Sequence, residues 1–152
     1  MMTLTLEGDQ YVVVTRRFAA SPEAVYRAHL DAALIREWML GPDGWTMTIC
    51  ESAAAPGDKI HFAWSDAHGN GFFLTGESLV MEPFERLVHV ERMHLPDRTP
   101  DHYVKTTFAP DGTGTLMTMR MTLPNAATRQ AMLSTGMEQS IKASYVRLDT
   151  VL

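Results

Sequence analysis

Two strand-like segments in the middle of the chain carry polar, ionisable side chains at alternate positions among apolar ones. Successive side chains on a strand point to opposite faces, so every second residue shares a face. The faces of interest consist of Phe73, Thr75 and Glu77 on one segment and Leu87, His89, Glu91 and Met93 on the next. If both faces point inward, two carboxylates and an imidazole meet an apolar space. Glu77 and His89 could then orient a ligand or act as an acid/base pair.

The same groups also allow interpretations that involve no chemistry. Because an unpaired buried charge is costly, Glu77, His89 and Glu91 can simply neutralise one another. Alternatively, His89 or Glu91 can lie on the solvent face of the sheet. The sequence leaves these alternatives open, and a structure with Glu77 and His89 on opposite faces of the sheet excludes the pair.

The remaining residues that could do chemistry are scattered. His29 falls in a predicted helix, His61 alternates outward, and the others lie near turns: His68, His94 and His102. We therefore expect surface histidines, no metal site and no cofactor. The chain contains neither a serine-nucleophile motif nor a glycine-rich phosphate loop. Its single cysteine cannot form an internal disulfide.

The composition argues against several classes of partner. The chain has 152 residues, 45% of them hydrophobic, with a formal net charge of −5, which predicts one domain over residues 1–152. An acidic chain without a basic stripe is a poor match for nucleic acid. No segment approaches the ~20 apolar residues of a membrane-spanning helix, and the first residues lack the pattern of a secretory leader. We expect a cytoplasmic protein that binds neither nucleic acid nor membrane.

Capping and turn residues divide the chain into the elements that must position these groups. Residues 10–18 are β-branched and aromatic and predict a strand. Ser21, followed by proline, begins one short helix, and Asp31 caps a second that ends before Gly41. Six further strand-like segments are separated by turn-rich sequences. These segments are residues 45–52, 59–65, 72–82, 86–94, 103–109 and 115–123.

A long final helix is predicted after Pro124, with Asn125 as its cap. Apolar residues recur along it every three or four positions and form one stripe. The stripe consists of Leu133, Met137, Ile141, Tyr145, Leu148 and Leu152. Two strands offer matching apolar faces, made of Met117, Met119 and Met121 and of Ile60, Phe62 and Trp64. These faces predict a concave apolar surface that the final helix covers.

Besides this order of elements, particular residues spread over nearly the whole chain match the pattern of a known family. They are the run from Phe18 to His29, then Asp31, Ile35, Trp38, Gly41-Pro42, Pro56-Gly57, Gly76, Leu79 to Met81, Pro83, Arg86-Leu87 and Gly136 to Gln139. With them the chain resembles the family named after the activator of heat-shock-protein-90 ATPase, within the START and Bet v 1 helix-grip superfamily. It departs from the family at Asp58, where a second glycine is frequent, and at Met39, where a second tryptophan is frequent.

The resemblance implies an α+β fold of helix-grip (Bet v 1/START-like) type. A curved seven-stranded antiparallel sheet would wrap around a long C-terminal helix, with two short helices between strands 1 and 2. The match also implies that Leu79 and Met81 face inward, which would turn Glu77 inward with them. A strongly curved sheet and a straight helix cannot touch everywhere, so we expect a hollow between them rather than a plain core.

The expected function is to bind a small hydrophobic or aromatic molecule in that hollow. The residues expected to line it are Trp38, Met47, Phe62, Trp64, Phe73, Glu77, His89, Met119, Met137 and Ile141. Two alternatives remain: an enzyme of the same fold, similar to cyclases or hydrolases, and a partner that activates a chaperone ATPase. A homodimer is also considered, because proteins of this fold often self-associate.

Overall fold

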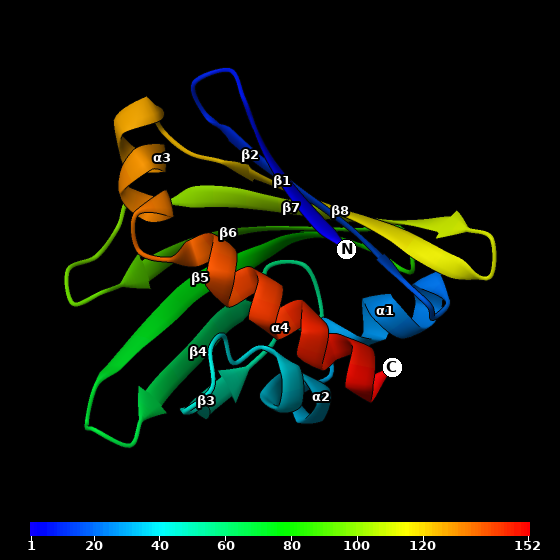
Figure 1. The fold of residues 1–152 in the computed structure, drawn as a ribbon, viewed down its shortest axis with the longest axis horizontal. Coiled ribbons are helices and arrows are strands. Elements are labelled where there is room, and N and C mark those ends of the chain that lie inside the picture. Colours follow the sequence, from blue (N-terminus) through cyan, green and yellow to red (C-terminus); the bar gives the residue numbers. More distant parts are fainter.

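The computed structural model describes residues 1–152 as one antiparallel sheet with helices against one face (Figure 1). The strands follow the spatial order β1-β2-β8-β7-β6-β5-β4-β3. The strands are β1 (Met2–Glu7), β2 (Tyr11–Phe18), β3 (Trp45–Glu51), β4 (Lys59–Asp66), β5 (Gly71–Glu82), β6 (Arg86–His94), β7 (His102–Asp111) and β8 (Gly114–Thr122). The helices are α1 (Pro22–Ala28), α2 (Ala32–Trp38), α3 (Ala126–Leu133) and α4 (Met137–Val151). The expected α+β class with an antiparallel sheet is confirmed.

The sheet has eight strands, not the expected seven. The additional strand is β1, which pairs with β2 from Met2 opposite Arg16 to Glu7 opposite Tyr11. Gly8 adopts a positive φ of 50° in the tight turn between them, a conformation that glycine reaches without strain. The sequence signal for β1 is weak because this edge strand is mostly exposed and so needs no buried apolar face.

The two short helices lie between β2 and β3, as expected. The Ser21 side chain accepts a hydrogen bond from the amide of Ala24 (3.2 Å), and Asp31 accepts one from the amide of Ala33 (3.0 Å). These caps satisfy amides that a helix leaves free at its start. Because β2 and β3 lie far apart in the sheet, α1 and α2 must span the distance between them, at the end of the sheet where the chain terminates (Figure 1).

The prediction of a single long final helix is wrong, because the segment after Pro124 forms two helices, α3 and α4. Asn125 caps α3 as expected, accepting from the amide of Thr128 (2.8 Å). The break falls at Gly136, whose φ of 85° is left-handed and incompatible with a continuous right-handed helix. The apolar stripe is therefore divided, and only α4 lies across the sheet (Figure 1).

Close packing is concentrated beside the C-terminal half of α4. Tyr145 meets Phe18 edge to face (ring centroids 5.7 Å apart) and stacks on Trp38 (6.1 Å), while Leu148 is fully buried. Nε1 of Trp38 donates to the Ala28 carbonyl (2.9 Å), which fixes the indole. The N-terminal half of α4 is only partly buried. The helix therefore leaves the sheet less tightly covered near Met137.

None of the four helices combines the length and the apolar character needed to cross a lipid bilayer.

Candidate functional site

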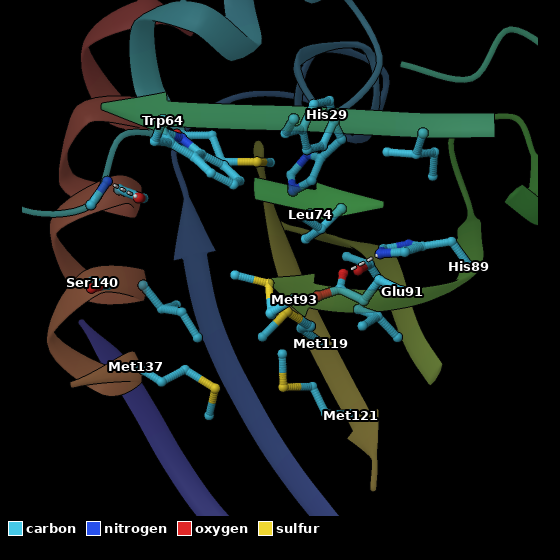
Figure 2. Close-up of a pocket in the computed structure, with 18 of the residues that line it drawn as sticks. His29, Trp64, Leu74, His89, Glu91, Met93, Met119, Met121, Met137 and Ser140 are labelled. Atoms are coloured by element: carbon cyan, nitrogen blue, oxygen red, sulfur yellow. Dashed lines mark hydrogen bonds and ion pairs between the residues drawn. The ribbon is translucent and has the colours of Figure 1, made fainter. Parts of the chain in front are cut away.

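A cavity of about 590 Å³ lies between the sheet and α4. Of its 33 lining residues 22 are apolar, and they come from the sheet, from the connection after α2 and from α3 and α4. Figure 2 shows methionine side chains from β6, β8 and α4 directed into the same space. The volume is in the range of small-molecule sites, roughly 300–1,000 Å³.

Seven of the ten residues expected to line the hollow do line this cavity. They are Trp38, Phe62, Trp64, His89, Met119, Met137 and Ile141. On β4 and β8 the alternation rule selects the inward side chains correctly, because those strands pair in unbroken register over these residues. The structure thus brings together side chains that are up to 103 positions apart in the chain (from Trp38 to Ile141).

Phe73 and Glu77 were expected in the cavity and lie instead on the outer face of the sheet. Phe73 is 39% exposed and stacks on the imidazole of His94, with ring centroids 4.1 Å apart. Glu77 accepts a hydrogen bond from Arg92 (2.8 Å) on the same outer face. The hypothesis that Glu77 and His89 form an acid/base pair is therefore wrong, since the two side chains point to opposite faces.

A β-bulge in β5 explains this error. Ser78 pairs with His89 and Val80 pairs with Val88, so Leu79 is an extra residue without a partner and is 44% exposed. A bulge of this kind shifts the alternation by one residue. Counting back in twos from Met81 across Leu79 therefore selects the wrong face. The inward residues before the bulge are Phe72, Leu74 and Ser78.

Met47 is the third expected residue that does not line the cavity. Its side chain is buried opposite Trp64 on the neighbouring strand, in a cluster that also contains Ile35, Phe62 and Leu74. Met47 therefore packs behind the cavity wall and supports Trp64.

A buried carboxylate between two imidazoles forms the most polar part of the site. Glu91 accepts from Nε2 of His89 (2.6 Å) and from Nε2 of His102 (3.0 Å). Figure 2 shows the His89–Glu91 contact at the edge of the cavity. His89 and Glu91 line the cavity, whereas His102 is fully buried behind them. The expectation that His102 is a surface histidine is wrong, because it begins β7 directly opposite Glu91.

Hydrogen bonds in this cluster set the charges of its members. Burial raises the pKa of Glu91, but the hydrogen bonds from His102 and His89 outweigh burial and hold the pKa well below its ordinary value. For His102, burial lowers the pKa, whereas the bond to Glu91 and a contribution from the Pro100 carbonyl raise it above its ordinary value. Nδ1 of His102 makes no well-formed hydrogen bond, so the Glu91 contact is the main partner of this imidazole.

His29 is a site residue that the sequence analysis missed. It lies at the end of α1, lines the cavity, and its ring meets those of Trp38 (5.0 Å) and Phe108 (5.2 Å) edge to face. Burial lowers the pKa of His29 to about 4, despite an opposing hydrogen bond to the Val25 carbonyl. The signal available in the sequence was its position four residues after the buried Val25 on one helix face.

The low pKa of His29 predicts an acid-sensitive contribution to stability. The folded-state pKa of about 4 lies below the ordinary 6.5, so protonation favours the unfolded chain. Between pH 6.5 and 4 the wild type should therefore lose stability that a His29→Asn variant does not lose. On going from pH 7 to pH 4.5, the free energy of unfolding of the wild type should fall by about 2 kcal/mol more than that of the variant, from ~1.4 kcal/mol for each pH unit. Urea denaturation at pH 7 and pH 4.5 measures it, and parallel losses in both proteins contradict it.

The remaining lining is notable for its sulfur atoms and its lack of cationic side chains. Six methionines line the cavity: Met39, Met93, Met119, Met121, Met132 and Met137. No lysine or arginine is among the lining residues. The Tyr145 hydroxyl has only the Met119 sulfur as a partner, at 3.9 Å, and burial raises the pKa of Tyr145 above its ordinary value. The walls are therefore polarisable and carry few polar groups.

No group of three or more histidine, cysteine, aspartate or glutamate side chains could hold a metal ion. In the cluster around Glu91, the Nε2 atoms of both imidazoles are already engaged by the carboxylate.

Comparison with known proteins identifies similar sequences and folds. Residues 19–152 match a family described as activator of Hsp90 ATPase homolog 1-like protein. No match was found among curated proteins.

Several solved structures share the fold over nearly the whole chain. A protein from Rhodobacter sphaeroides is 26% identical with a TM-score of 0.89, and the alignment covers 99% of this chain and 97% of that one. Protein Ms6760 from Mycobacterium smegmatis is 17% identical with a TM-score of 0.84, with the same coverages. The AHSA1 protein from Silicibacter pomeroyi is 18% identical with a TM-score of 0.75 and covers 92% and 95%. At 17% and 18% identity, the last two show a common fold alone.

Proposed function

Because the chain belongs to the family of activator of Hsp90 ATPase homolog 1-like proteins, we propose that residues 1–152 act as one helix-grip unit that binds a small apolar or aromatic molecule. Family membership supports ligand binding or a chaperone-associated role in general terms. The cavity favours the first of these. The guest would lie between the sheet and α4, against residues such as Trp38, Phe62 and Ile141.

The observation that carries the proposal is the cavity itself. It has an apolar lining, a volume of about 590 Å³ and a few polar groups at defined positions. Small-molecule sites combine apolar walls with a small number of polar groups in this way. A plain core of this size would instead be filled by side chains to the density of an organic crystal.

Titration with a neutral fluorescent probe tests the proposal. N-phenyl-1-naphthylamine should bind with one saturable site, increase its emission on entering an apolar space, and be displaced by naphthalene. Native mass spectrometry should show one guest for each chain. A linear rise in emission without saturation, or failure of naphthalene to compete, would contradict a defined internal site.

An enzymatic role is a second candidate, favoured by the bond between His89 and Glu91. The carboxylate accepts from Nε2 of His89 at 2.6 Å, which leaves Nδ1 free to take a proton from a bound molecule when the imidazole is neutral. Both residues line the cavity. A substrate screen tests this role: a turnover that persists unchanged in His89→Gln would exclude the dyad as its acid/base group.

Two further parts of the proposal concern the setting of the protein. We place it in the cytoplasm and consider a homodimer, both of which were expected from the sequence. Cell fractionation checks the first, and sedimentation equilibrium checks the second.

A further inference from the structure

We propose that the cavity selects uncharged aromatic molecules that carry a hydroxyl or N–H group, and that Nε2 of His29 accepts the hydrogen bond from that group. This inference rests on the ligand-binding function proposed above and adds the class of guest and the residue that recognises it.

The orientation of His29 is fixed by its surroundings. Nδ1 lies 2.8 Å from the Val25 carbonyl, an acceptor only, so the proton of a neutral imidazole must be on Nδ1. The rings of Trp38 and Phe108 hold the imidazole edge to face. Nε2 consequently carries a lone pair, and the one hydrogen bond of the His29 side chain is the one at Nδ1. Figure 2 shows the imidazole directed into the cavity.

Several other polar groups of the cavity are engaged within the protein. Glu91 accepts from two imidazoles. Ser144 accepts from the amide of Gly41 (2.9 Å), and Ser52 donates to the carbonyl of Leu30. Nε2 of His29 and Nδ1 of His89 both make no hydrogen bond to the protein. The His89 side chain is 26% exposed and lies at the edge of the cavity, so His29 offers the more enclosed acceptor. A donor on the guest would complete its hydrogen bonding.

The charge of the walls disfavours anionic guests. The lining contains no lysine or arginine, and His29 stays neutral because burial lowers its pKa to about 4. The one carboxylate, Glu91, would repel a second negative charge. A guest carboxylate would thus lose its hydration without gaining a cationic partner, which is costly.

The apolar walls favour an aromatic ring over an alkyl chain. Besides His29 and Tyr145, five aromatic side chains line the cavity together with six methionines. They are Trp38, Trp45, Phe62, Trp64 and Phe72. Methionine sulfur makes favourable contacts with ring edges, and aromatic side chains stack or meet edge to face. Both kinds of contact need a ring on the guest.

Three naphthalenes with matched rings test the proposal, with displacement of N-phenyl-1-naphthylamine as the readout. The guests are 2-naphthol, which has a donor, 2-methoxynaphthalene, which has the same oxygen without a donor, and 2-naphthoate, which is anionic. We expect 2-naphthol to bind roughly three- to tenfold more tightly than 2-methoxynaphthalene, the effect of one neutral hydrogen bond. We expect 2-naphthoate to bind at least about tenfold more weakly than 2-naphthol.

His29→Asn is the decisive variant, because the asparagine amide can still donate to the Val25 carbonyl while the acceptor at the position of Nε2 is lost. It should bind 2-naphthol and 2-methoxynaphthalene with equal affinities. Equal affinities in the wild type, a preference retained in His29→Asn, or tightest binding of 2-naphthoate would each overturn the proposal. If naphthalene itself does not bind, the proposed function fails as well. Where His29→Asn does not fold, the wild-type comparison still tests the preference for a guest that carries a donor.

Discussion

Replacing Met93 with tryptophan is expected to lower the affinity for N-phenyl-1-naphthylamine by roughly 30-fold, the loss of about 2 kcal/mol of apolar contact. Met93 lies on β6 and points into the cavity beside Leu74 and Met119 (Figure 2). It contacts both groups of buried side chains that surround the cavity. An indole at this position would occupy space that a guest needs, and the cavity of about 590 Å³ can hold the larger ring without overpacking.

Met93→Leu provides the matched control. Leucine is similar to methionine in volume, and such exchanges usually cost less than about 1.5 kcal/mol. This variant should keep the wild-type affinity. Thermal unfolding should show that Met93→Trp is at least as stable as the wild type, so that a loss of binding cannot reflect unfolding. Unchanged binding in a folded Met93→Trp would place the probe somewhere other than this cavity.

Removing the Glu91 carboxylate is expected to destabilise the protein by about 3–5 kcal/mol, the usual effect of leaving a buried ionic partner unpaired. In Glu91→Ala, His102 would remain fully buried without its main hydrogen-bond partner. The outer-face variant Glu77→Ala is the control, because its partner Arg92 also bonds Asp101. The Glu77 side chain is 41% exposed and Arg92 keeps its bonds to Asp101, so its removal should cost only about 0–1 kcal/mol. Urea denaturation of both variants measures the difference.

The effect of Glu91→Ala should depend on pH. The folded-state pKa of Glu91 is lowered, so its contribution is present above the ordinary value of 4.5 and is lost as the pH falls towards the folded value. The pKa of His102 is raised, so its contribution is present below the ordinary 6.5 and is lost as the pH rises through the folded value. The destabilisation should therefore be largest between pH 4.5 and 6.5 and smaller at pH 9. An effect independent of pH would indicate that lost packing, not charge pairing, is responsible.

Sequence patterns predicted the fold where each element obeys one simple rule. The caps at Ser21, Asp31 and Asn125 are present, and strict alternation placed Phe62 and Met119 in the cavity wall. These features depend only on neighbouring residues. They can be derived from local physical chemistry without knowing the rest of the chain.

The errors arose where one residue changes the phase or direction of the backbone. Leu79 adds a residue to β5 and reverses the faces assigned to Phe73 and Glu77. Gly136 separates α3 from α4 through its positive φ. His102 follows a turn-rich segment, and its burial depends on the register that places it opposite Glu91. Register is a property of two strands together, so the sequence of one strand cannot reveal it.

The six methionines around the cavity make its chemistry sensitive to oxidants. Oxidation converts a thioether to a sulfoxide, which turns a flexible apolar side chain into a polar and chiral one. Each sulfoxide on Met93, Met119 or Met137 would place a strong acceptor on a wall that now has few polar groups. Samples stored in air and samples kept under reducing conditions would then present different interiors to the same guest, and methionine sulfoxide reductase would restore the original one.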